Sequence, residues 1–423
     1  MPVNVMPTLV MKPMRQILTT DGAENSRAAS PNPSSHRNPN IVDSTTAAEL
    51  AAKATMINKR LEGIKSLLSI DLTLRLIQSA KAVIERLGVF IRDSPIPTSK
   101  IQDNCQSVFV QLLHTLGERH LKPGFDQAIS LLEPDKASEE QSNSDALTGF
   151  AEMINVCDLI QQMVDVFYEE ELCSKQLSDR NSFTDSASKE KKAFEQSLDE
   201  WVASGLNRGL EAILNRIQAA LTTKQLITDY DPEAAIYDVA KLKTPAARAK
   251  ANQRESMQLD FATTPTAATN DVCEVLSTPV QSLRGAIDAS ILDVFYTELG
   301  LRLFGALRKH ILRMRISTRG ATQLMIDMAA YYEFVDKTLA RSIKNQASSK
   351  DICLYFESLR RVAEIYLVSG DAKLLIPMVT DQDRWKGIFD REEILEFISR
   401  RADWLTIRKS VEKGLDGTEC TIM

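Results

Sequence analysis

The chain has 423 residues, of which 43% are hydrophobic and only 6% aromatic, and its formal net charge at pH 7 is −6. This length allows several domains or one extended array with a large buried core. The acidic balance argues against nucleic acid as a partner of the whole molecule. Leu, Ala, Ile and Met are plentiful, which favours helix over strand.

The scattered arrangement of the cysteines and the lack of a recognisable signal peptide predict a cytoplasmic protein. The six cysteines are scattered without a C-x-x-C pair, and we find neither a signal peptide nor an uninterrupted apolar run of about 18 residues. The four histidines do not fall at metal-ligand spacing, and no phosphate-binding or nucleophile-elbow motif is present. We therefore expect no enzyme activity, no metal and no cofactor.

The N-terminal half begins with a tail and continues as helices. Residues 1–43 are polar and interrupted by prolines, which indicates disorder. A helix is expected to begin at Ser44 or Thr45, and residues 44–221 read as one helical bundle region. The apolar residues that recur at helical spacing in its first part are Leu50, Ile57, Leu61, Ile64, Leu68, Leu72, Leu76, Val83 and Leu87. Later helical patterns cover about 101–116, 146–177 and 193–221, with a polar loop at 136–145.

Residues 222–271 form the largest interruption, with Pro232, Pro245 and Pro265 and few bulky apolar residues. Such a length predicts a functional or disordered polar loop. Residues 272–413 then read as a C-terminal bundle region, with helices near 322–343, 352–368, 372–380 and 391–413 and a loop at 345–350. Residues 414–423 are expected to be a flexible tail. The fold class predicted is all-α.

The strongest helical pattern lies in the C-terminal region. Apolar residues spaced by four predict one helix over about 280–316: Leu283, Ile287, Ile291, Phe295, Leu299, Leu303, Leu307 and Ile311. Gly300 and Gly305 interrupt it, each at a cost of about 1 kcal/mol relative to Ala. They are either tolerated imperfections or points where a neighbouring helix approaches closely.

A basic cluster follows along the same stretch: Arg302, Arg308, Lys309, Arg313, Arg315 and Arg319, with His310 among them. One interpretation is a solvated helix face, favoured at its C-terminal end by the helix dipole. The other is a patch for anionic lipid headgroups or an acidic partner.

The last four residues, Cys420-Thr421-Ile422-Met423, match a C-a-a-X box with Met at X, which predicts farnesylation of Cys420. One prenyl chain holds a membrane weakly, so stable anchoring needs a second signal. Basic residues upstream are candidates for it: Arg400, Arg401, Arg408, Lys409 and Lys413. Nearby acids dilute this cluster, and we expect reversible contact with a membrane surface.

Several strings resemble the exocyst component five family: HLKPGFDQAISLL (120–132), TDYDP (228–232), TPTAATNDVCEVL (264–276), the stretch 299–334, LYFESLRRVAEIYLV (354–368) and the stretch 381–404. The resemblance covers about residues 45–410. It implies an elongated array of stacked helical bundles, as in multisubunit tethering complexes, and a cytoplasmic protein peripheral to endosomes, secretory vesicles or the plasma membrane. The partners implied are Rab-type small GTPases, exocyst or other tether subunits, and vesicle SNAREs.

Within that family the terminal box is similar to the recyclin branch, fungal F-box proteins of recycling from endosomes to the plasma membrane. The F-box expected of that branch, which binds Skp-type adaptors, is not recognisable in residues 1–43. The leading hypothesis is a prenylated, non-enzymatic tethering or adaptor protein. The alternatives are a core exocyst subunit, a ubiquitin-ligase adaptor whose F-box is missing from this chain, and an unrelated helical scaffold.

Overall fold

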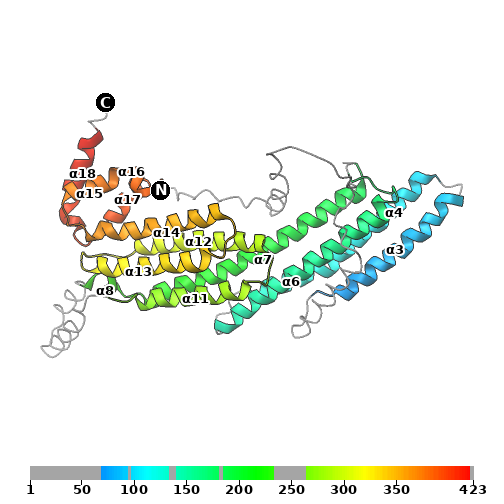
Figure 1. Cartoon of the computed structure of the whole chain (residues 1–423), viewed down its shortest axis with the longest axis horizontal. Coiled ribbons are helices and arrows are strands. Elements are labelled where there is room, and N and C mark those ends of the chain that lie inside the picture. Colours follow the sequence, from blue (N-terminus) through cyan, green and yellow to red (C-terminus); the bar gives the residue numbers. More distant parts are fainter. Residues whose placement is uncertain (1–67, 94–96, 133–139, 181–183, 233–262, 420–423) are drawn as a thin grey trace, which may run out of the picture. The chain divides into compact units, whose positions relative to one another are not determined.

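The structure is a computed structural model that describes residues 68–93, 97–132, 140–180, 184–232 and 263–419 (Figure 1). These residues are predominantly helical, and the extended pairing among them amounts to an isolated bridge between Ile316 and Arg401. The predicted all-α class is confirmed. The expected tail at 1–43 and the C-a-a-X box lie outside the described residues.

The chain divides into two compact units. Unit 1 holds residues up to 209 together with 285–290, and unit 2 holds 210–284 and 291–423. The division falls inside one helix, α7 (Ser186–Lys224). The sequence had instead predicted a division at the 222–271 loop.

Unit 1 contains α3 (Ile70–Asp93), α4 (Thr98–His114), α5 (Lys122–Leu131), α6 (Glu140–Phe167), the first part of α7, and the π-helical turns η1 (Thr115–Leu121) and η2 (Tyr168–Cys173). Helix α3 packs against α4 and α6 (Figure 1). Helix α7 approaches α6 closely at Gly205, where a Cβ atom would lie 1.9 Å from the ring of Phe150. The predicted loop at 136–145 is shorter than expected, because α6 already begins at Glu140.

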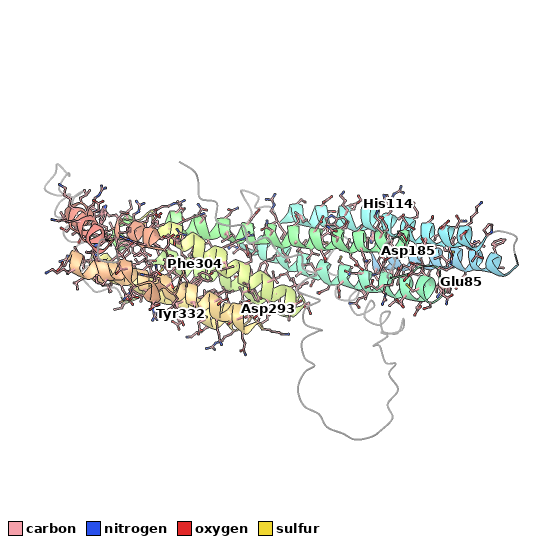
Figure 2. The ribbon with its side chains drawn as sticks, turned by 90° about the horizontal axis from the view of Figure 1, so that it is seen from above. Glu85, His114, Asp185, Asp293, Phe304 and Tyr332 are labelled. Carbon is pink, nitrogen blue, oxygen red and sulfur yellow. The ribbon has the colours of Figure 1, made fainter. Side chains whose placement is uncertain are left out.

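Unit 2 contains the rest of α7 and the helices α8 (Ile227–Tyr230), α11 (Ala267–Leu283), α12 (Ala289–Ile311), α13 (Gly320–Phe334), α14 (Gln346–Leu367), α15 (Ala372–Thr380), α16 (Gln382–Trp385), α17 (Arg391–Ile398) and α18 (Trp404–Glu419), with a π-helical turn η3 (Val335–Ala340). Helix α13 packs along α14 and against α11, and α15 packs against α18. Phe304, labelled in Figure 2, anchors the core, with its ring centroid 5.0 Å from that of Tyr355 and 5.8 Å from that of Phe389.

The prediction of one helix over 280–316 was wrong. Helix α11 ends at Leu283 and α12 begins at Ala289, because Gly285 adopts φ = 82°, which few other residues tolerate. The apolar face that the four-residue spacing predicted is nevertheless buried. Its members Leu299, Leu303, Leu307 and Ile311 are fully buried.

The sequence left open whether the two glycines of α12 are tolerated imperfections or points of close helix approach, and the structure shows one of each. A Cβ atom on Gly300 would lie 3.1 Å from the Ile352 side chain, so Gly300 marks a close approach of α14. A Cβ atom on Gly305 would meet nothing within 4 Å.

Three further boundaries differ from expectation. The loop predicted at 345–350 is the first turn of α14, where the Asn345 side chain accepts a hydrogen bond from the Ala347 amide at 3.0 Å and caps the helix. The helix predicted over 391–413 is two helices, α17 and α18. Residues 414–419, expected to be a flexible tail, continue α18.

The break between α17 and α18 is held by Arg401, which is 4% exposed. Its guanidinium donates to the carbonyls of Ile365 (2.6 Å) and Val368 (2.9 Å) and forms a two-pronged pair with Asp403, each bond 2.8 Å. The Arg401 pair holds the pKa of the Asp403 carboxyl below its usual range. Arg401 therefore stabilises the end of α14 and is not a surface charge.

A buried carboxylate binds the chain on both sides of residues 233–262. Residues 233–262 themselves lie outside the described part of the chain. Asp327, on α13, is 0% exposed. It accepts hydrogen bonds from the Tyr230 hydroxyl (2.7 Å), the Thr266 amide (2.8 Å), the Thr266 hydroxyl (2.9 Å) and the Gln323 amide group (3.2 Å). Burial raises the pKa of the Asp327 carboxyl, and these hydrogen bonds oppose the rise. The expected 222–271 loop is thus ordered at both of its described flanks.

Tyr230, on the N-terminal side of residues 233–262, also holds the loop between α12 and α13. The Tyr230 carbonyl accepts a hydrogen bond from the Ser317 amide at 2.9 Å, and the Ser317 hydroxyl accepts one from the Gly320 amide at 3.1 Å. A Cβ atom on Gly320 would lie 1.8 Å from the Tyr230 carbonyl oxygen. On its other side the loop pairs with the α17–α18 connection, because the Ile316 amide donates to Arg400 (3.0 Å) and the Ala402 amide donates to Ile316 (2.8 Å).

We expect Gly320→Ala to destabilise unit 2 by about 2–3 kcal/mol, because a methyl group has no space beside the Tyr230 backbone. Gly305→Ala is the matched control. It makes the same change inside a helix with free space, and should stabilise by up to about 1 kcal/mol. Urea unfolding of both variants measures the difference. Equal effects of the two substitutions would contradict the close contact at Gly320.

We expect Asp327→Ala to destabilise unit 2 by about 3 kcal/mol, because it leaves the buried Tyr230 hydroxyl and the part-buried Thr266 donors without an acceptor. Asp327→Asn should cost less, since its carbonyl oxygen still accepts the Thr266 amide and the hydroxyls can rotate to accept from its amide group. Thermal and urea unfolding measure both variants. An Asn variant as unstable as the Ala variant would assign the effect to charge instead of hydrogen bonding.

Candidate functional site

The basic cluster predicted from the sequence occupies α12 and the loop that follows it in unit 2. The structure separates its six members into two groups by their partners. The first group forms ion pairs within the fold, and the second is exposed without an ion pair to any described residue.

Arg302, Arg308 and Arg315 are bound within the fold. Arg302 donates to Glu298 one turn earlier at 2.7 Å, and Arg308 forms an ion pair with Glu393 of α17. Arg315 lies 3.3 Å from the buried carboxylate of Asp231 and donates to the Ala402 carbonyl at 3.2 Å. Arg308 and Arg315 fasten α12 and its loop to neighbouring segments, whereas the Arg302 pair lies within α12. The Arg315 side chain stays 58% exposed.

Lys309, Arg313 and Arg319 are exposed, and no ion pair links them to any residue that the structure describes. They lie in the last turn of α12 and in the loop held by Tyr230. We call these three residues the α12 basic trio. His310 beside them adds no charge at neutral pH, because burial, with a smaller effect of Arg313, lowers its pKa to about 4.

Cys420 lies outside the described residues, one position after α18 ends at Glu419. Of the basic residues upstream, Arg401 is buried, so the prediction that it is a surface charge was wrong. Arg408 pairs with Glu412 at 2.7 Å and Arg400 lies 3.7 Å from Glu396. Lys409 and Lys413 are exposed on α18.

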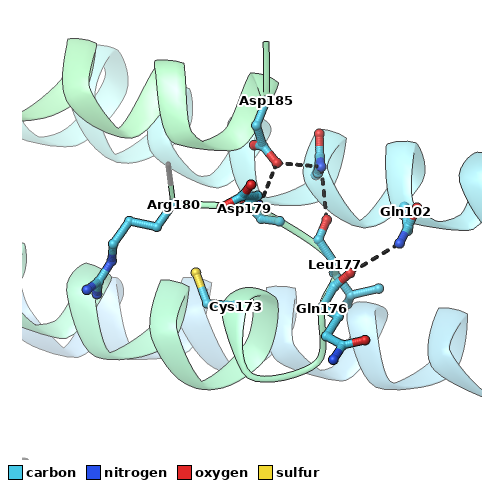
Figure 3. Close-up of a pocket in the computed structure, with 9 residues that line it drawn as sticks. Gln102, Cys173, Gln176, Leu177, Asp179, Arg180 and Asp185 are labelled. Atoms are coloured by element: carbon cyan, nitrogen blue, oxygen red, sulfur yellow. Dashed lines mark hydrogen bonds between the residues drawn. The ribbon is translucent and has the colours of Figure 1, made fainter. Parts of the chain in front are cut away.

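A polar hollow of about 530 Å³ lies in unit 1 between α4 and the chain that follows η2 (Figure 3). Its glutamines are engaged in holding that chain. Gln102 donates to the Gln176 carbonyl at 3.1 Å, and Gln106 donates to the Leu177 carbonyl at 2.9 Å and to Asp185 at 3.0 Å. Burial raises the pKa of the Cys173 thiol in the wall, so this cysteine is not a nucleophilic thiolate at neutral pH. The hollow reads as a structural junction.

Among the described residues, no group of three or more His, Cys, Asp or Glu side chains is placed to hold a metal ion. Likewise, none of the described helices combines the length and apolar character that crossing a bilayer requires.

Sequence reasoning gave no buried role to three charged residues that hold unit 2 together: Asp231, Asp327 and Arg401. A signal was available for one of them, since Asp327 stands within the apolar stretch LMIDMAAYY. The strings TDYDP and TPTAATND were singled out only for their resemblance, and the structure brings them together on Asp327.

Comparison with known proteins agrees with this architecture. A family model described as exocyst complex component Sec10-like, alpha-helical bundle, matches residues 9–413. Recyclin-1 of Saccharomyces cerevisiae is 33% identical over 394 residues, and F-box protein pof6 of Schizosaccharomyces pombe is 32% identical over 378 residues. Exocyst complex component 5 of Drosophila melanogaster is 21% identical over 352 residues.

The alignments cover most of this chain but less than half of the relatives. They include 89%, 89% and 82% of the chain, against 44%, 40% and 42% of the respective relative. The family model nevertheless reaches across both units. The chain therefore belongs to the exocyst complex component Sec10-like, alpha-helical bundle family.

Proposed function

We propose that this chain is a non-enzymatic tethering or adaptor protein of vesicle transport that acts in recycling from endosomes to the plasma membrane. The observation that carries the proposal is the family match over residues 9–413, which includes helices of both units. The relatives named recyclin and exocyst component support the same class of role. Loss of the protein should leave a recycled plasma-membrane protein in internal compartments, and normal surface return would contradict the proposal.

Such a protein acts by binding other macromolecules through its helix faces. The partners we propose are Rab-type small GTPases, exocyst or other tether subunits, and vesicle SNAREs. The location is cytoplasmic and peripheral, on endosomes, secretory vesicles or the plasma membrane.

Membrane contact in this proposal begins with a prenyl group on Cys420. Because α18 ends at Glu419, the lipid would be attached directly after a helix. A single chain gives only marginal membrane binding, so a second contribution is required. The α12 basic trio can supply it, since exposed cations without acidic partners are attracted to anionic headgroups.

Two other functions have a specific observation in their favour. The similarity to exocyst complex component 5 favours a core exocyst subunit, which would purify with the remaining subunits at fixed stoichiometry. The similarity to a protein named F-box protein favours an adaptor of a ubiquitin ligase, which would bind a Skp-type adaptor in a pull-down.

We expect Cys420→Ser to move the protein from the membrane fraction to the soluble fraction of cells, because the prenyl acceptor is lost. Met423→Leu is the control, since Leu at the last position keeps a C-a-a-X box and directs geranylgeranylation instead. Fractionation, with mass spectrometry of the C-terminal peptide, measures both. An unchanged distribution of Cys420→Ser would remove prenylation from the proposal.

We expect combined Lys309→Gln, Arg313→Gln and Arg319→Gln to weaken binding to phosphatidylserine-containing vesicles by roughly a hundredfold, at about 1 kcal/mol for each cation. Binding to neutral vesicles should not change. The matched control removes three exposed cations elsewhere in unit 2, at Arg341, Lys344 and Lys350. A similar loss in the control would show that total charge, and not the α12 basic trio, determines binding.

A further inference from the structure

The N-terminal end of α18 carries two large apolar side chains that unit 2 leaves open to solvent. Leu405 is 89% exposed, more than any other large hydrophobic residue that the structure describes, and Trp404 before it is partly exposed. We call these two residues the α18 tip. A single exposed leucine is normal on a protein surface, so the tip indicates a partner only through its surroundings.

The α18 tip faces away from the side on which α18 packs. Helix α18 lies against α15 (Figure 1), and the buried residues on its inner side are Ile407, Val411 and Leu415. Leu405 precedes Ile407 by two positions, which is about 200° around a helix of 3.6 residues per turn. Leu405 therefore projects outward from a helix whose other side is fixed in the core.

The loop between α12 and α13 lies directly beside the α18 tip. The Ala402 amide donates to the Ile316 carbonyl at 2.8 Å, and the Arg315 guanidinium donates to the Ala402 carbonyl at 3.2 Å. Arg313 and Arg319 are each three residues from Ile316, so the chain places them at most about 11 Å from this contact. Exposed cations of this loop and the exposed apolar tip thus share one end of unit 2.

The acidic residues close to the tip in sequence are engaged by cations. Asp403, directly before Trp404, forms the two-pronged pair with Arg401, and Glu412 pairs with Arg408 at 2.7 Å. Lys409, one turn after Leu405, is exposed without an ion pair to a described residue. The charge left unbalanced around the tip is therefore positive.

An apolar projection surrounded by unbalanced cations complements the surface of an anionic bilayer. Phosphate and carboxylate headgroups attract the cations, while tryptophan and leucine side chains are favoured at the boundary with the acyl chains. We propose that the α18 tip inserts into the interface of an anionic bilayer, with the neighbouring arginines at the headgroups. The inference rests on the membrane contact under Proposed function and adds the residues that enter the lipid.

Insertion makes part of the binding resistant to salt, because salt screens exposed charges and does not weaken apolar burial. The test measures binding of the full chain, without a prenyl group, to phosphatidylserine-containing vesicles at about 0.1 M and about 0.5 M salt. We expect Leu405→Ser to weaken binding about tenfold at both, and Leu405→Phe to bind like the unsubstituted chain. Leu131→Ser is the matched control, since it removes a 61% exposed leucine from unit 1 and should change nothing.

Tryptophan fluorescence gives a second readout that does not require a change at Leu405. Trp385 is fully buried, and Trp201 packs in unit 1 with its ring centroid 5.7 Å from that of Phe125. Vesicles with brominated acyl chains should therefore quench Trp404 selectively. Trp404→Phe should remove the quenching, and Leu405→Ser should reduce it severalfold.

The outcomes separate the insertion from the membrane contact on which it rests. If the unsubstituted chain binds no anionic vesicles at either salt concentration, both are overturned. If it binds, but Leu405→Ser binds equally well and Trp404 stays unquenched, the insertion alone is overturned. If Leu405→Ser instead loses co-purifying exocyst subunits while vesicle binding is unchanged, the α18 tip belongs to a protein partner and the insertion is again overturned.

Discussion

The carboxylate of Asp327 is the constraint from which the arrangement of unit 2 follows. A buried charge is costly unless hydrogen bonds replace its hydration. Here the donors come from Tyr230, Thr266 and Gln323, so the carboxylate is satisfied only when α8, the start of α11 and α13 meet. Tyr230 in turn binds Ser317 through its carbonyl. The position of the loop carrying Arg313 and Arg319 therefore depends on a group that contacts neither of them.

Helical spacing alone was enough to predict the fold class and most of the core. The four-residue steps at Leu299, Leu303, Leu307 and Ile311 correspond to fully buried side chains. The same spacing could not locate the ends of helices. It carried one helix through Gly285, where the left-handed backbone conformation changes the direction of the chain, and that choice depends on contacts distant in sequence.

The candidate site was predictable only in part, because charge spacing does not reveal ion-pair partners. Arg308 and Lys309 are neighbours in sequence, yet Arg308 is bound to Glu393 and Lys309 is exposed. Glu393 lies more than eighty residues away, so no local pattern distinguishes the two. Arg401 was counted among membrane-facing cations for the same reason, although its guanidinium is enclosed by the carbonyls at the end of α14.

The attachment of Tyr230 and Thr266 to one carboxylate has a consequence for variation and for engineering. Tyr230 and Thr266 are both bound to Asp327, which holds the two ends of residues 233–262 at a fixed point of unit 2 whatever the length of that segment. Lengthening a connection between fixed ends costs only about 0.6 kcal/mol of closure entropy for each doubling. A fluorescent reporter or affinity tag inserted there can consequently be accommodated while the surrounding helices keep their places.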